Sequence, residues 1–198
     1  MFVLVENDSI TKTLSPSKGI TIGENQYPRA IYTSWSTAER EAIGIYEVVF
    51  DNTNKKDEAY YTNTNQSFAF ADGTVTASYG DATAKAHADT LFTADDEDNG
   101  LGTEGEVKVE GLKTKKIRTI KQQAASELAR TDWYIVRKAD ADTAVPSAIT
   151  NHRAAVRTKC AQMETAITNA SNTAAIETLY TRDADGVRPL GELPTLEV

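Results

Sequence analysis

Hydrophobic positions alternate with polar or small ones in the first half of the chain and recur at helical spacing in the second half. The alternation is clearest between residues 58 and 79. There Phe68 and Phe70 are separated by alanine, and Val75 and Ala77 are separated by threonine. A period of two is typical of strands that bury one face. The pattern therefore predicts a strand-rich amino-terminal region.

Turn and capping signals punctuate this region. Asp72-Gly73 lies between the two alternating runs and is a dipeptide favoured in two-residue hairpin turns. Ser36 and Glu39 have the spacing of a capping box, which predicts one short helix, and Gly44 suits the left-handed position after its end. Residues 82–92 are expected to form another short helical turn.

Two longer amphipathic helices are predicted in the second half, where apolar residues recur at intervals of three and four. Their apolar stripes consist of Ile117, Ile120, Ala124 and Leu128, and of Ile149, Val156, Cys160, Met163 and Ile167. Pro146 suits the first turn of the second helix, and the polar run 140–144 separates the pair. We expect the two helices to pack as an antiparallel hairpin, with Trp133 in the core at its elbow.

A glycine-rich acidic run joins the two halves of the sequence. Residues 95–106 carry six carboxylates and no base, which is typical of an exposed loop or linker. The sequence thus predicts an α+β fold with four parts. These are a β-rich amino-terminal domain (1–93), an acidic linker (94–106), a helical carboxy-terminal domain (107–180) and an extended tail (181–198).

Charge and composition narrow the class of protein. The chain is 198 residues long and 40% hydrophobic, and it has no apolar run near the roughly 18 residues of a membrane helix. Residues 1–106 have a net charge of −11 and residues 107–198 a net charge of +3. Phosphates would meet repulsion over half the chain, so nucleic acid and membrane are not expected partners. The amino terminus lacks a basic segment before an apolar one, which favours synthesis in the cytosol.

No residue pattern indicates catalysis. His87 and His152 are far in sequence from Cys160, and Cys160 falls on an apolar helical stripe where a cysteine acts as a small hydrophobe. We therefore expect no enzyme activity, cofactor or metal, although a small enzyme with a site assembled from distant residues stays an alternative. Asp95 and Glu106 have the spacing of the first and last ligands of a calcium loop, so a calcium-stabilised binding module is another alternative.

One stretch of the second half carries a more specific pattern. Thr131-Asp132-Trp133 is followed by Pro146 and by a helix with Arg153 and Arg157. This stretch, within residues 121–163, resembles the carboxy-terminal part of bacteriophage tail-fibre assembly proteins. Those proteins commonly have a serine or threonine before Asp-Trp, then a proline and a helix with a "YR..LR" pattern. His152 stands where that pattern has tyrosine.

The resemblance implies a function in protein–protein contact and transfers no catalytic residue. It implies an accessory protein, made in the host cytoplasm, that binds the tail fibre or baseplate and stays in the virion tail as part of a homo- or hetero-oligomer. A tail-fibre assembly chaperone that leaves before the particle is complete is the alternative. Aromatic residues and arginines are the usual anchors of interfaces. The predicted partner-binding residues are Trp133, Tyr134, Arg137, Arg153 and Arg157.

Overall fold

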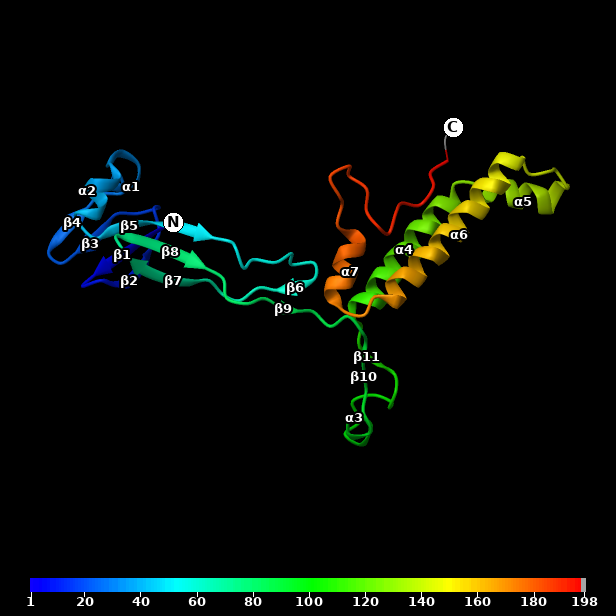
Figure 1. Cartoon of the computed structure of the whole chain (residues 1–198), viewed down its shortest axis with the longest axis horizontal. Coiled ribbons are helices and arrows are strands. Elements are labelled where there is room, and N and C mark those ends of the chain that lie inside the picture. The colour runs from blue at the N-terminus through cyan, green and yellow to red at the C-terminus, as the bar shows by residue number, and fades with distance from the viewer. Residues whose placement is uncertain (197–198) are drawn as a thin grey trace. The chain divides into compact units, whose positions relative to one another are not determined.

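The computed structural model describes residues 1–196 and divides into two compact units, Met1–Thr83 and Ala84–Val198. The first unit contains most of the strands and the second contains the long helices (Figure 1). The prediction of a mixed α+β chain, strand-rich at its amino end and helical at its carboxy end, is confirmed. The boundary lies ten residues earlier than the predicted one, at 83 instead of 93.

The first unit is built on one five-stranded sheet with the strand order β2-β1-β5-β8-β7. Neighbouring strands are antiparallel except β5 and β8, which run parallel. Its strands and helices are β1 (Phe2–Glu6), β2 (Ser9–Leu14), β3 (Ile20–Ile22), β4 (Asn25–Tyr27), α1 (Ile31–Ser34), α2 (Thr37–Glu41), β5 (Ile45–Asp51), β6 (Tyr61–Thr62), β7 (Ser67–Ala71) and β8 (Thr74–Ser78), with β9 (Thr83–Ala84) at the boundary.

Alternating residues of the sheet pack into two separate hydrophobic cores, one on each face. On β1, Phe2 and Leu4 pack with Ile31 of α1, whereas Val3 packs on the other side with Val75 of β8. This is the two-sided burial that a period of two produces when both faces of a central strand are covered. The middle strand β5 and its neighbours β1 and β8 therefore contribute side chains to the buried cores of the unit.

The predicted turn signals of the first unit are confirmed. Ser36 accepts a hydrogen bond from the backbone N–H of Glu39, and the Glu39 carboxylate accepts one from the backbone N–H of Ser36. Gly44 has a φ of 80° just after α2, in the left-handed region that favours glycine. Asp72 and Gly73 both have positive φ and connect β7 to β8 as a two-residue hairpin turn.

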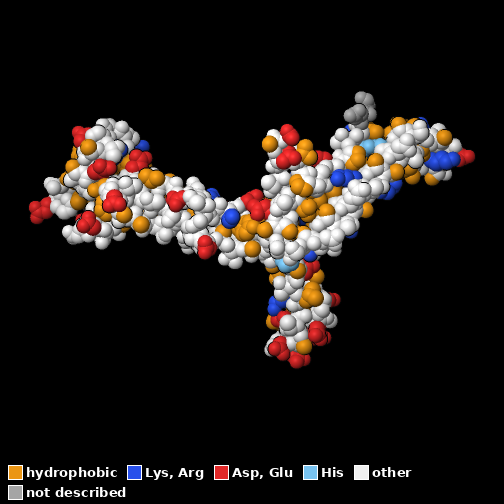
Figure 2. Space-filling model, in the orientation of Figure 1, with side chains coloured by type: hydrophobic (Ala, Val, Ile, Leu, Met, Phe, Trp, Pro, Cys, Tyr) orange, Lys and Arg blue, Asp and Glu red, His pale blue; other side chains and the backbone are white. Residues whose placement is uncertain are grey.

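Of the two predictions for the acidic segment, linker or exposed loop, the structure shows an exposed loop inside the second unit, and the short helix expected at 82–92 is absent. Residues 90–91 form β10 (Thr90–Leu91), which pairs with β11 (Val107–Val109), and α3 (Ala94–Asp98) lies between them. Phe92 and Glu106 hydrogen-bond through their backbones, so the acidic run begins and ends at the same place. Figure 2 shows acidic side chains gathered around α3, which forms the tip of a hairpin inside the second unit.

The second unit is organised around two long antiparallel helices (Figure 1). Lys113, near the start of the first helix, donates to the carbonyl of Thr168, near the end of the second helix. Lys121, further along the first helix, pairs with Glu164, which comes earlier in the second helix, so the two helices run in opposite directions. Both predicted apolar stripes, apart from Ile149, meet in their shared core. The helices of this unit after α3 are α4 (Leu112–Ala129), α5 (Asp132–Ala141), α6 (Ser147–Asn169) and α7 (Thr173–Tyr180).

The predicted tail does not extend away from the helices. Leu190 is 3% exposed in the core formed by α4 and α6, and its backbone N–H donates to the carbonyl of Leu179. The backbone N–H of Leu196 donates to Glu127 on α4. Residues 181–196 are therefore an arm that docks on the chain's own helices, and residues 197–198 of the predicted tail lie outside the described part.

Candidate functional site

Helix α5 exposes apolar side chains and buries none. Trp133 is 51% exposed, Ile135 44% and Val136 65%, and no residue of α5 is buried. Figure 1 shows α5 at the end of the α4–α6 pair, and Figure 2 shows hydrophobic side chains mixed with charged ones there. Since a surface helix normally turns its apolar side to the core, α5 is the candidate interaction surface of the second unit.

An aromatic and arginine cluster occupies the first turns of α5. The rings of Trp133 and Tyr134 lie 3.8 Å apart between centroids at an angle of 34°. The guanidinium carbon of Arg137 lies 4.7 Å from the Trp133 ring centroid and 5.5 Å from that of Tyr134. Cation–π contact holds Arg137 against both rings, so the three side chains form one preorganised group, here called the α5 cluster.

The prediction that Trp133 lies in the core is wrong. Helix α4 ends at Ala129, and Thr131 has a φ of −120° and a ψ of 4°, which breaks the helix and redirects the chain. Thr131 itself takes the buried position at the elbow and is fully buried. Trp133 lies in the connection between the long helices, as expected, but it faces solvent.

Arg153 is buried, in contrast to Trp133. It was predicted to face a partner, but it is 7% exposed and its Nη1 group lies 2.7 Å from the carbonyl oxygen of Leu128 and 2.7 Å from Oγ1 of Thr131. The same nitrogen lies 2.8 Å from Oδ1 of Asp132. Arg153 therefore fastens the end of α4 and the start of α5 to α6. A sequence signal existed, because position 153 falls on the apolar stripe between Ile149 and Val156.

The remaining predicted residues stay near the surface. Tyr134 and Arg137 are half-buried in the α5 cluster, and Arg157 is exposed one turn after Arg153 on α6. The structure thus brings Trp133, Tyr134 and Arg137 together and places neither Arg153 nor Arg157 in their cluster. Partner binding by these residues stays a prediction.

Glu127 forms a second polar group near the elbow. Its carboxylate accepts hydrogen bonds from the Leu196 backbone N–H and from Arg130, and it lies 3.3 Å from Nε2 of His152. The Leu196 N–H, and then Arg130, hold the pKa of Glu127 below its ordinary value. His152 therefore lies against the carboxylate that accepts the Leu196 N–H of the arm.

Cys160 and the acidic segment do not form chemical sites in the described residues. Cys160 is buried on α6, and its burial, with Glu164 beside it, raises the pKa of the thiol. In the acidic segment, Asp96 caps α3 and pairs with Lys108, and Glu97 accepts the Glu104 backbone N–H. Within residues 1–196, no group of three or more His, Cys, Asp or Glu side chains is arranged to hold a metal ion.

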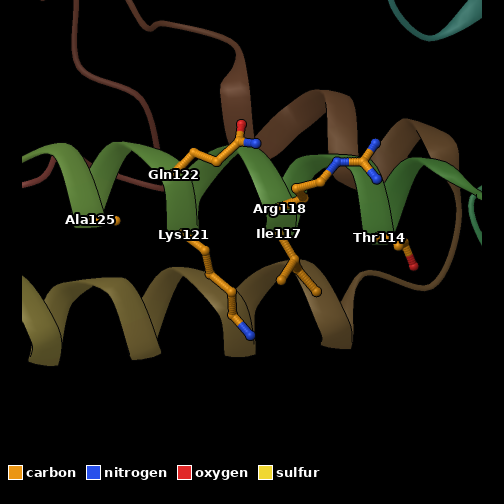
Figure 3. Close-up of a pocket in the computed structure, with 6 residues that line it drawn as sticks. All are labelled: Thr114, Ile117, Arg118, Lys121, Gln122 and Ala125. Atoms are coloured by element: carbon orange, nitrogen blue, oxygen red, sulfur yellow. The ribbon is translucent and has the colours of Figure 1, made fainter.

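A shallow groove also runs along α4, where Figure 3 shows Ile117 and Lys121 pointing towards the neighbouring helix. Both cations that line it already have internal partners, since Arg118 pairs with Glu110 and Lys121 with Glu164. The groove is open, and its polar groups do not converge on one point. It is lined by Thr114, Ile117, Arg118, Lys121, Gln122 and Ala125.

Comparison with protein-family models, with curated proteins and with solved structures finds no match to this chain. In residues 1–196 none of the helices is both long enough and apolar enough to cross a membrane.

Proposed function

We propose that the chain is a phage tail accessory protein that binds the tail fibre or baseplate and remains in the virion tail as a structural component. In this proposal the antiparallel α4–α6 pair is a helical hairpin that presents α5, and the α5 cluster contacts the partner. The observation that carries the proposal is the exposure of Trp133 beside Tyr134 and Arg137, since these three residue types dominate the binding energy of protein interfaces.

The internal contacts of Arg153 support the use of the family resemblance. Thr131 and Asp132 both contact Arg153, so two parts of the pattern that are distant in sequence act as one structural unit. This explains physically why a chain with Thr-Asp-Trp at the elbow would also need an arginine at this point of α6. These contacts hold the start of α5 in place, and Trp133 is exposed to solvent.

The test is a pull-down of the phage tail-fibre and baseplate proteins by the wild-type chain and by Trp133→Ala. Truncation of a central interface tryptophan costs at least about 2 kcal/mol, so binding should weaken by about thirtyfold or more. Leu101→Ala is the matched control, because Leu101 is also exposed in the second unit but lies beyond α3, away from α5. Equal binding by both variants and the wild type would exclude the α5 cluster as the contact.

A transient assembly chaperone is the second candidate, because the same surface could grip a fibre only while it folds. Mass spectrometry of purified particles separates the two. A structural component should be present at a fixed ratio to the fibre protein, whereas a chaperone should be found in the lysate and not in the particle. Absence from both fibre complexes and particles would reject the proposed function.

A further inference from the structure

Arg137 has an unusual position among the arginines of the second unit. Arg118, Arg130, Arg153, Arg182 and Arg188 each pair with a carboxylate of the chain itself. In the described residues Arg137 and Arg157 have no such ion pair, and of these two only Arg137 lies against aromatic rings, with its Nε buried and without a hydrogen-bond partner. Its charge is held in place by the two rings and is not neutralised.

The cation–π contacts of Arg137 use the face of the two rings and not a carboxylate or carbonyl oxygen. The guanidinium carbon lies over both rings, and the N–H donors of a guanidinium lie in its own plane. Those donors match the two oxygens of a carboxylate, and such charge-assisted pairs are the strong hydrogen bonds of interfaces. Side-chain entropy has already been lost in the stack, so less is lost on binding.

The apolar part of the surface limits the size of the contact. From their exposed fractions, Trp133, Ile135 and Val136 together offer on the order of 300 Å² at most, and Ile135, two positions after Trp133, faces a different side of the helix. A stable interface takes about 800 Å² from each partner. A second copy that used this face alone would therefore bury too little, and Arg137 would meet the arginine of the other copy or have to be moved away from it.

We infer that the α5 cluster binds a protein segment with an apolar side chain that covers Trp133 and a nearby aspartate or glutamate that pairs with Arg137. This inference rests on the proposed function of α5 as a contact surface, but it concerns the chemistry of the partner and holds for any protein partner. Lys138, the next residue on the helix, already pairs with Asp142 and is not part of this contact.

The test selects a random peptide library on the immobilised full chain and removes peptides that also bind Trp133→Ala. The recovered peptides should be enriched in an apolar residue followed or preceded by aspartate or glutamate. Their binding should fall by about tenfold or more in Arg137→Gln, because a charge-assisted hydrogen bond is lost, and should be unchanged in Lys138→Gln. Changing the acidic residue of the peptide to its amide should cause the same loss without altering the protein.

Three results would overturn the inference. Recovered peptides without an acidic preference, or with equal affinity for Arg137→Gln, would show that Arg137 does not recognise a carboxylate. Failure to recover any peptide whose binding depends on Trp133 would remove the α5 cluster as the site. Dimerisation in sedimentation velocity that is abolished by Trp133→Ala would make a second copy the occupant. A positive library result with no phage fibre partner would reject the proposed function and leave this inference standing.

Discussion

Replacing Arg153 with alanine removes the side chain that fastens both α4 and α5 to α6. The Arg153 Nη1 group donates to the Leu128 carbonyl and to the Thr131 hydroxyl, and it pairs with Asp132. Because Thr131 is fully buried, its hydroxyl oxygen loses a buried hydrogen-bond donor when the arginine is removed. It keeps its own hydrogen bond to the Leu128 carbonyl.

The magnitude follows from these contacts. A hydrogen bond that involves a charged group contributes about 1.5–3 kcal/mol, and Arg153 makes two to buried or half-buried acceptors. The side chain of Asp132 is 57% exposed, so its ion pair adds only about 0–1 kcal/mol. Part of the loss is recovered because burying a guanidinium is itself costly. We expect Arg153→Ala to lower the free energy of unfolding of the second unit by about 2–4 kcal/mol.

Urea unfolding followed by tryptophan fluorescence measures this loss. Trp35 lies in the first unit and Trp133 in the second, so the Trp35→Phe background makes Trp133 the reporter of the elbow. Arg157→Ala is the matched control, because Arg157 is an exposed arginine one turn later on the same helix. Its cost should stay within about 0.5 kcal/mol.

Equal unfolding midpoints for the Arg153 and Arg157 variants would refute the role given to Arg153. Arg153→Lys gives a further check, since lysine keeps the charge but cannot reproduce the planar set of donors. It should recover only part of the lost stability. Full recovery would mean that charge alone matters, and the hydrogen bonds to Leu128 and Thr131 would then contribute little.

Three further predictions concern other parts of the second unit. Leu190→Ala should lower its unfolding free energy in urea by about 2 kcal/mol or more, because Leu190 is buried against the helices, and an unchanged midpoint would mean that the arm is not docked. Gly111→Ala should cost more than about 1 kcal/mol in the same assay, since the new Cβ would lie 2.3 Å from backbone atoms of Ala88, and a neutral result would contradict that close approach. The pKa of Asp96 is lowered from 3.8 to about 2, first by the Lys108 ammonium and then by the Thr93 backbone N–H, so a carboxyl NMR titration should have its midpoint near 2. Because the folded pKa is the lower one, the stabilisation is complete above 3.8 and is lost as the pH falls through about 2; Lys108→Met should raise the midpoint, and a wild-type midpoint near 3.8 would contradict the pairing.

Local chemistry in the sequence was sufficient for several elements. The apolar stripe of α6 is buried as predicted, because a regular helix repeats its faces every three or four residues whatever surrounds it. Ser36 and Glu39 satisfy each other's backbone N–H groups within a single turn. The positive φ of Asp72 and Gly73 likewise depends only on the residues of the turn.

The acidic segment shows where local reasoning was insufficient. Its composition is that of a linker, but the Asp96 carboxylate pairs with Lys108, twelve positions later, and accepts a hydrogen bond from the backbone N–H of Thr93. Phe92 and Glu106 then close the segment through backbone hydrogen bonds. A hairpin of this kind depends on pairing between β10 and β11, which are too short for a periodic signal.

The sequence by itself determined that the second half forms amphipathic helices and that the connection between them begins near Thr131-Asp132-Trp133. Only the tertiary structure decided which of Trp133 and Arg153 faces the solvent. Periodicity predicts burial within one regular helix, but the break at Thr131 rotates α5 relative to α4 and the period does not continue across it. Arg153 is buried because two acceptors, 22 and 25 positions earlier in the chain, meet it in space. With the arginine inside, the tryptophan is left on the surface as the candidate contact.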